Sequence, residues 1–216
     1  MKPATIYYAT SSPFKKAELR IIEDKIAIAS SDESGILIGQ VCSFVISPVP
    51  TDEPLEIDLD AMVRHKVRSA YRSLLMPCIV EHAGLILDRD AKVGFPGGLT
   101  QPMWDALTAD GFLRRTGAAG ERAVARAVVG YCDGASVRTF TGETQGVIAD
   151  NPRGGRDFYW DTVFCPDGFG NKTYAEIAAE PGGLEVKVRA SQSMKALSQL
   201  ASYIMKNGAG ALFGSA

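Results

Sequence analysis

The chain has 216 residues, of which 46% are hydrophobic, and 23 Lys and Arg stand against 25 Asp and Glu. This composition suits one domain with a real core, and the net charge of −2 excludes the basic surplus of a nucleic-acid-binding protein. No apolar run reaches the ~18 residues that span a bilayer, and the first residues lack a signal peptide's apolar stretch, so we expect a cytoplasmic protein without a membrane partner.

The first half of the chain predicts strands alternating with helices. Residues 5–10 are β-branched and aromatic, which is typical of a strand. Ser11, Ser12 and Pro13 then supply a cap and a first-turn proline for a helix over 14–23. Further elements expected in this half are strands at 25–30 and 42–48, a helix at 58–75, and strands at 77–83 and 85–88 on either side of a turn at Gly84.

The second half begins with a loop over 94–102 that is too rich in glycine and proline for a helix or a strand. Alternating apolar and polar residues on both sides of Asp133-Gly134 predict a hairpin within 126–150. The other elements expected are helices at 103–113 and 119–126, a strand at 158–168 and a last helix at 191–207. Together they predict an α/β protein with a mixed sheet, one domain over 1–207 and a flexible tail at 208–216. The four cysteines form no Cys-x-x-Cys pair and are expected as buried, reduced thiols.

The turn after the first strand is a candidate anion site. A helix N-terminus presents free N–H groups, to which Thr10 and Ser12 add hydroxyls. Lys15 lies one turn into the helix and could reach a phosphate, and Glu18 follows on the same face, where a carboxylate could hold Mg²⁺. Taken alone, the segment favours a capped surface helix with a Lys–Glu pair.

Glu81 and His82 are the second candidate. A carboxylate at a strand end could hold a hard cation, and an imidazole could act as a general base. A strand end reaching solvent and an inert, packed ring explain the same residues. The loop around Gly97 could approach a ligand with its backbone, or it could be only a turn.

Aromatic and basic residues supply the remaining candidates. Phe158, Tyr159 and Trp160 could stack on a nucleobase while Asp161 reads an N–H group, although core aromatics would show the same pattern. Two further lysines could reach a phosphate, and a serine stands at a helix start; these residues are Lys66, Lys187 and Ser191.

Ordered motifs connect these candidates along nearly the whole chain. They are Thr10-Ser11-Ser12 with Lys15 and Glu18, Lys66, Glu81 to Leu85, Gly94 to Gly97, Phe140 with Gly142, Gly146 and Ile148, Pro152 to Gly154, Phe158 to Gly168, Lys172 to Glu176, and Lys187 with Ser191, Gln192, Ser193, Ala196 and Leu197. In this order they resemble the inosine triphosphate pyrophosphatase family, whose members hydrolyse deaminated purine nucleoside triphosphates to the monophosphate and pyrophosphate. The resemblance implies a two-lobed fold with a long twisted sheet, a nucleotide cleft between the lobes, Mg²⁺ and a homodimer. It also implies phosphate contacts from the lysines and metal contacts from Glu18 and Glu81.

The chain departs from the family pattern where catalysis and base recognition occur. His82 replaces the acid that the family uses to activate water, and an imidazole is a poor partner for Mg²⁺. Another family acid, in the loop after the third strand, has no clear match, although Asp52 or Glu53 could replace it. Gln192 and Ser193 stand where the family reads the purine 6-oxo group with His and Arg, and Tyr159 replaces a glycine.

These departures favour a degenerate member of the family. Such a protein would bind a purine nucleoside triphosphate such as dITP or ITP with Mg²⁺, hydrolyse it slowly or not at all, and signal to an effector protein subunit, as members of this fold do in antiphage defence. The alternative is an active pyrophosphohydrolase of altered base specificity, with His82 as the base or with a relocated acid. The retained lysines disfavour a structural subunit with an empty cleft.

Overall fold

One mixed β-sheet forms the centre of the protein. The computed structural model describes residues 2–28, 35–155 and 159–209, and within them six strands pair in the order β2-β1-β3-β4-β5-β6. The first three strands are parallel and the others antiparallel. The strands are β1 Ala4–Tyr8, β2 Cys42–Ile46, β3 Cys78–Leu87, β4 Arg122–Cys132, β5 Val137–Ile148 and β6 Phe164–Pro166.

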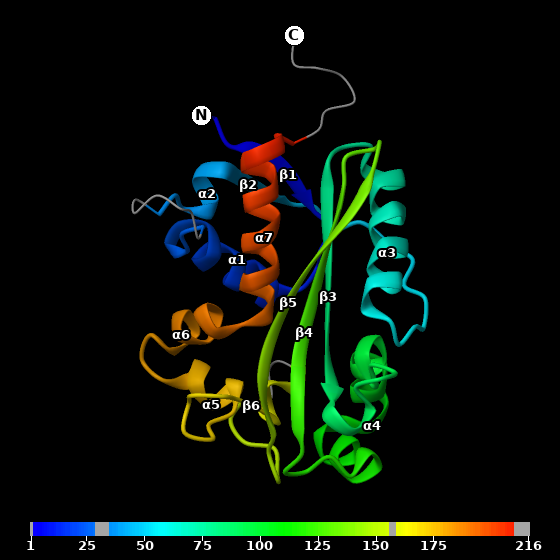
Figure 1. Cartoon of the computed structure of the whole chain (residues 1–216), viewed down its shortest axis with the longest axis vertical. Coiled ribbons are helices and arrows are strands. Elements are labelled where there is room, and N and C mark those ends of the chain that lie inside the picture. The colour runs from blue at the N-terminus through cyan, green and yellow to red at the C-terminus, as the bar shows by residue number, and fades with distance from the viewer. Residues whose placement is uncertain (1, 29–34, 156–158, 210–216) are drawn as a thin grey trace.

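Helices cover both faces of the sheet, with α1, α2 and α7 on one side of the long strands and α3 and α4 on the other (Figure 1). Separate apolar clusters lie under them: α1, α2 and α7 share one with β1 and β2, α3 packs on β3 and β4, and a third lies around α4, α5 and β6. The predicted α/β fold with a mixed sheet is therefore confirmed. The helices are α1 Pro13–Lys25, α2 Ile38–Val41, α3 Leu59–Leu74, α4 Thr100–Thr116, α5 Tyr174–Ala179, α6 Gly183–Ala190 and α7 Gln192–Asn207, with short 3₁₀ segments at Asp88–Asp90, Gly97–Leu99 and Tyr159–Thr162.

Side-chain caps fix where the helices and the hairpin begin. The Ser12 hydroxyl accepts a hydrogen bond from the Lys15 N–H at 3.4 Å and begins α1. Ser191 does the same for α7, accepting from the Met194 N–H at 3.1 Å. These predicted starts are confirmed, as is the hairpin, which turns at Asp133 between β4 and β5.

Two predicted elements are wrong, a third is much shorter than predicted, and three helices, α2, α5 and α6, were not predicted. Residues 119–126 belong largely to β4, because every second residue there is a small buried alanine facing the core, which overrides alanine's preference for helices. Lys25 ends α1, and only an isolated bridge from Ala27 to Leu37 follows, so the strand at 25–30 is absent from its described part. The strand at 158–168 shortens to β6 behind the turn at Tyr159–Thr162. In α5 and α6 the apolar residues do not recur at a clear helical spacing, so the sequence did not predict these helices. Residues 210–216 of the expected tail lie outside the described residues.

β3 runs straight through Gly84, where the sequence predicts a turn. Gly84 pairs with Arg126 of β4, and a Cβ atom at Gly84 would lie 2.1 Å from the carbonyl oxygen of Gly97. The Thr100 hydroxyl secures this approach, since it donates to the Gly97 carbonyl at 2.7 Å and accepts from the Leu85 N–H at 2.9 Å. The glycine therefore allows the loop after β3 to pack on the strand, two residues beyond His82.

Two expectations from composition can be compared with the structure. Across the described ranges, no helix is long and apolar enough to cross a membrane. All four cysteines are buried and free, as predicted.

Substituting Gly84 by alanine tests this packing. Because the added methyl group would meet backbone rather than a flexible side chain, we expect Gly84→Ala to lower the free energy of unfolding by about 3 kcal/mol. Gly117→Ala is the matched control: Gly117 has a φ of 60°, but its Cβ would meet nothing within 4 Å, so only the left-handed backbone costs about 1 kcal/mol. Urea unfolding of both variants measures the difference, and equal losses would contradict the close approach.

Candidate functional site

A cavity of about 600 Å³ opens between the β1–α1 turn, β3, α4, and the segment from α6 to α7. It collects nearly all of the predicted site residues from distant parts of the chain. Those lining it are Thr10, Ser12, Lys15, Glu18, Lys66, Glu81, His82, Tyr159, Trp160, Asp161, Lys187, Ser191 and Gln192. Gly97 does not line it and packs instead against the Ile57 carbonyl, while Phe158 lies outside the described residues.

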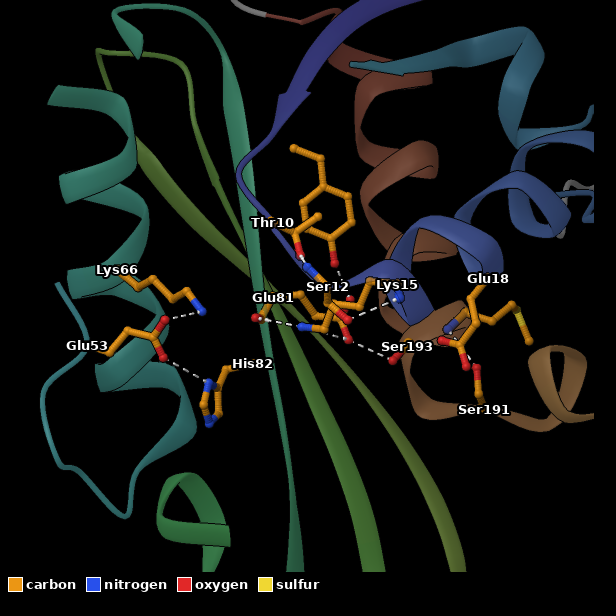
Figure 2. Close-up of polar contacts among 12 residues, drawn as sticks. Thr10, Ser12, Lys15, Glu18, Glu53, Lys66, Glu81, His82, Ser191 and Ser193 are labelled. Atoms are coloured by element: carbon orange, nitrogen blue, oxygen red, sulfur yellow. Dashed lines mark hydrogen bonds and ion pairs between the residues drawn. The ribbon is translucent and has the colours of Figure 1, made fainter. Parts of the chain in front are cut away.

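Glu81 points from β3 toward α1 and α7 (Figure 2), where its two carboxylate oxygens accept separate hydrogen bonds. The Tyr8 hydroxyl donates to one at 2.6 Å and the Ser193 hydroxyl to the other at 2.7 Å. Burial alone would raise the pKa of Glu81, but the Lys15 ammonium at 3.9 Å and these two donors hold it below the ordinary value. Glu81 is therefore a fixed, ionised carboxylate, and Ser193 serves it rather than a nucleobase.

His82 points to the other side of β3, because successive side chains of a strand alternate (Figure 2). Its Nδ1 lies 3.7 Å from a carboxylate oxygen of Glu53, a residue of the loop before α3. Its Nε2 is buried and has no hydrogen-bond partner among the described residues. Burial, together with the ammonium groups of Lys66 and Lys15, lowers the pKa of His82 to about 4. The imidazole is therefore neutral at pH 7, and Glu53, not Glu81, is its carboxylate neighbour.

Two lysines place positive charge in the cavity. Lys15 donates to the carbonyl oxygen of Glu81 at 3.0 Å, and Lys66 lies 2.8 Å from the carboxylate of Glu53. Burial and the nearby Lys15 charge lower the pKa of Lys66, which shows that the two ammonium groups repel each other in a poorly solvated space. An anion that bridges them would relieve this repulsion, so this end of the cavity suits a polyphosphate.

Lys187 is held by two carboxylates on the far side of the cavity. Its Nζ lies 2.8 Å from Glu18, and it also forms an ion pair with Asp161. Burial would lower the pKa of Lys187, but these carboxylates raise it. Asp161, predicted to read a nucleobase, is thus engaged by Lys187, and burial raises its pKa to about 7.

The predicted magnesium ligands fit the ion unequally. Among the described residues, no group of three His, Cys, Asp or Glu side chains is placed to hold a metal ion. Mg²⁺ can nevertheless bind through one or two carboxylates together with substrate phosphates. Glu81 fits this mode, since it lines the cavity and its pKa is lowered. Glu18 and Glu53 fit it less well, because their carboxylates already bind the ammonium groups of Lys187 and Lys66.

Aromatic residues also line the cavity. Tyr159 is 37% exposed, and its hydroxyl accepts a hydrogen bond from the Gln101 amide at 3.1 Å. Trp160 is almost entirely buried and packs edge-on against Phe164, so most of its ring belongs to the core. Of these two residues, Tyr159 therefore offers the larger surface to a planar ligand.

Several lining residues were not predicted, or were predicted only as alternatives. Glu53 appears in the sequence as one of two acids in a proline-rich loop, and nothing in that loop indicates which one faces the cavity. Tyr8 and Ser193 reach Glu81 across sequence separations of 73 and 112 residues, so no local pattern could reveal them. Gln101, Trp104 and Asp105 enter from α4, whose first turn was predicted as loop.

Known proteins share this fold and much of this sequence. The dITP/XTP pyrophosphatase of Methanopyrus kandleri is 36% identical over 154 residues, which cover 70% of this chain and 78% of the relative. An inosine triphosphate pyrophosphatase of Scheffersomyces stipitis is 29% identical over 206 residues, covering 94% and 98%. The solved structure of the Staphylococcus aureus Ham1 protein aligns with a TM-score of 0.66 at 18% identity, covering 94% of this chain and 98% of that one, which supports the fold.

A protein-family model also matches most of the chain. The model described as the Ham1 family matches residues 6–203, which include every described cavity residue and all the strands except the first two residues of β1. The predicted resemblance to the inosine triphosphate pyrophosphatases is confirmed, and the chain belongs to the Ham1 family.

Proposed function

We propose that this protein is an active pyrophosphohydrolase of noncanonical purine nucleoside triphosphates such as dITP, ITP and XTP. The relatives named as dITP/XTP and inosine triphosphate pyrophosphatases support the substrate class. The observation that carries the proposal is the carboxylate of Glu53 beside His82, in a cavity that also holds two lysines. The Glu53 carboxylate supplies the negative charge that the His82 imidazole lacks.

Substrate binding divides the cavity between two chemistries. Lys15 and Lys66 attract the triphosphate, and the N-terminus of α1 adds its dipole behind Ser12. The aromatic face of Tyr159, which also lines the cavity, packs against the base. These contacts orient the bond between the α- and β-phosphates toward Glu53 and His82.

Hydrolysis then needs a base for the attacking water. The water oxygen forms a bond to the α- or β-phosphorus, and the bond from that phosphorus to the bridging oxygen breaks. The products are the nucleoside monophosphate and pyrophosphate. Glu53 takes the proton of this water, because the Lys66 charge keeps its carboxylate ionised even though burial opposes ionisation. His82 is neutral and offers an acceptor atom within the same space, so it orients the water. Glu81, together with phosphate oxygens, would hold a magnesium ion, which would supply charge neutralisation for the leaving pyrophosphate.

A second candidate function is nucleotide binding without turnover. It is favoured by one observation, the neutral imidazole at position 82 where the family resemblance implies an acid. In that case the protein would retain the nucleotide and signal to an effector protein. The homodimer, the effector and the role in antiphage defence stay predictions of the resemblance.

The first prediction concerns Glu53. Glu53→Gln removes the base but keeps the size of the side chain, so we expect kcat for dITP hydrolysis with Mg²⁺ to fall about 100-fold. Nucleotide affinity should stay equal or increase, because Lys66 loses its competing carboxylate. Asp52→Asn is the matched control, since Asp52 lies next in the chain and pairs with Arg72 at the surface. Pyrophosphate release and calorimetric binding measure the two effects, and an unchanged kcat would contradict the role of Glu53.

The second prediction separates hydrolysis from sensing. His82→Asp places a second carboxylate beside Glu53, so in an enzyme that already uses Glu53 we expect no gain in turnover. In a binding protein whose only defect is the missing acid, the same change should raise hydrolysis. Pyrophosphate release from dITP, ITP, XTP and dATP distinguishes the two functions, and bound, intact dITP with wild-type protein would favour the second.

The third prediction uses the lowered pKa of His82. The unfolded chain protonates this imidazole near the ordinary 6.5, and the folded protein only near 4. Stability is therefore fully kept above pH 6.5 and falls as the pH drops toward 4, by about 2 kcal/mol at pH 5 from this residue. In urea unfolding at pH 7.5 and 5, wild type should lose about 2 kcal/mol more than His82→Gln. Equal losses would show that the imidazole is not held neutral.

A further inference from the structure

Two hydroxyl groups hold the carboxylate of Glu81 from two different elements. Tyr8, the last residue of β1, donates to one oxygen at 2.6 Å, and Ser193, in the first turn of α7, donates to the other at 2.7 Å. All three side chains are buried. Hydrogen bonds to an ionised acceptor are stronger than bonds between neutral groups, so the two donors fix the place of the carboxylate.

Lys15 lies beside this carboxylate without forming a close ion pair with it (Figure 2). Its Nζ is 3.9 Å from the same carboxylate oxygen that accepts from Ser193. The ammonium group donates instead to the backbone carbonyl of Glu81, at 3.0 Å. A direct hydrogen bond between an ammonium group and a carboxylate is about 2.8 Å long, so the Lys15 ammonium stops short of the carboxylate that attracts it.

The other two lysines that were predicted to bind phosphate are paired more closely. Lys66 lies 2.8 Å from a carboxylate oxygen of Glu53, and Lys187 lies 2.8 Å from one of Glu18. The protein neutralises these two ammonium groups directly. The Lys15 ammonium keeps more of its charge for an anion in the cavity, because its carboxylate neighbour is already satisfied by two hydroxyl groups.

We propose that Tyr8 and Ser193 are positioning residues for substrate binding. By donating to both oxygens of Glu81, they keep the Lys15 ammonium out of a close ion pair and available to the phosphate groups of a nucleoside triphosphate. This inference rests on the proposed function of the cavity. It adds two residues that act through Glu81 and Lys15 rather than through a contact with the substrate.

Ser193→Ala tests the role of one hydroxyl and leaves the other in place. The Glu81 oxygen that loses its donor should take the Lys15 ammonium, so the Kd for pyrophosphate, measured by calorimetry with EDTA present, should rise about tenfold. Ser193→Thr keeps a hydroxyl and should bind pyrophosphate as wild type does. Ser202→Ala is the matched control on the same helix and should leave the Kd unchanged, since the Ser202 hydroxyl donates to the Ser198 carbonyl within α7.

A second arm shows whether the effect passes through Lys15. In a Lys15→Gln background the ammonium group is absent, so adding Ser193→Ala should change the Kd by no more than about twofold. A purely structural role of Ser193 would instead weaken binding by the same factor in both backgrounds. Tyr8→Phe removes the other donor and should weaken pyrophosphate binding only where Lys15 is present.

The outcomes separate this inference from the proposed function. If wild-type protein binds pyrophosphate and Ser193→Ala binds it equally well, the inference alone is overturned. Equal losses with and without Lys15 overturn it as well. If wild-type protein neither binds pyrophosphate nor binds or hydrolyses dITP, the proposed function fails first and the inference fails with it.

Discussion

Two poorly solvated lysines share one cavity, and the arrangement of the site follows from this constraint. Lys15 and Lys66 approach the centre from α1 and α3, and each is balanced by a different carboxylate, Glu81 or Glu53. β3 places Glu81 on one side of the strand and His82 on the other. The pair of Lys15 with Glu81 and the pair of Lys66 with Glu53 therefore meet across this strand. The proposed function places the triphosphate here, where the two ammonium groups lie in one cavity.

The same balance explains how a histidine is tolerated at position 82. Burial and the two ammonium groups keep the imidazole neutral, so it adds no further positive charge to the cavity. Glu53 restores a carboxylate at this place from a different element, the loop before α3. In this account the chain has moved its acid rather than lost it.

The sequence predicted the fold class and most of the cavity, because caps, ordered motifs and strand patterns are local signals. It failed where the reason is a contact with a distant segment. From the sequence alone, the glycine at position 84 indicates a turn. Its real role is to leave room for the Gly97 carbonyl, which no local pattern reveals. The contact of Glu18 with Lys187 was not predicted, because the two residues lie 169 positions apart in sequence. The sequence could not choose between Asp52 and Glu53. Both lie in an irregular loop, which has no repeating pattern that shows which side chains face the cavity.

The central claim is that Glu53 does the work of an acid that position 82 no longer carries. The most direct test combines Glu53→Gln with His82→Asp and measures single-turnover pyrophosphate release from dITP with Mg²⁺. If the acid has moved, His82→Asp returns a carboxylate to position 82. The double variant should then release pyrophosphate at least tenfold faster than Glu53→Gln alone. A double variant as slow as Glu53→Gln alone, or a Glu53→Gln protein as fast as wild type, would contradict the account.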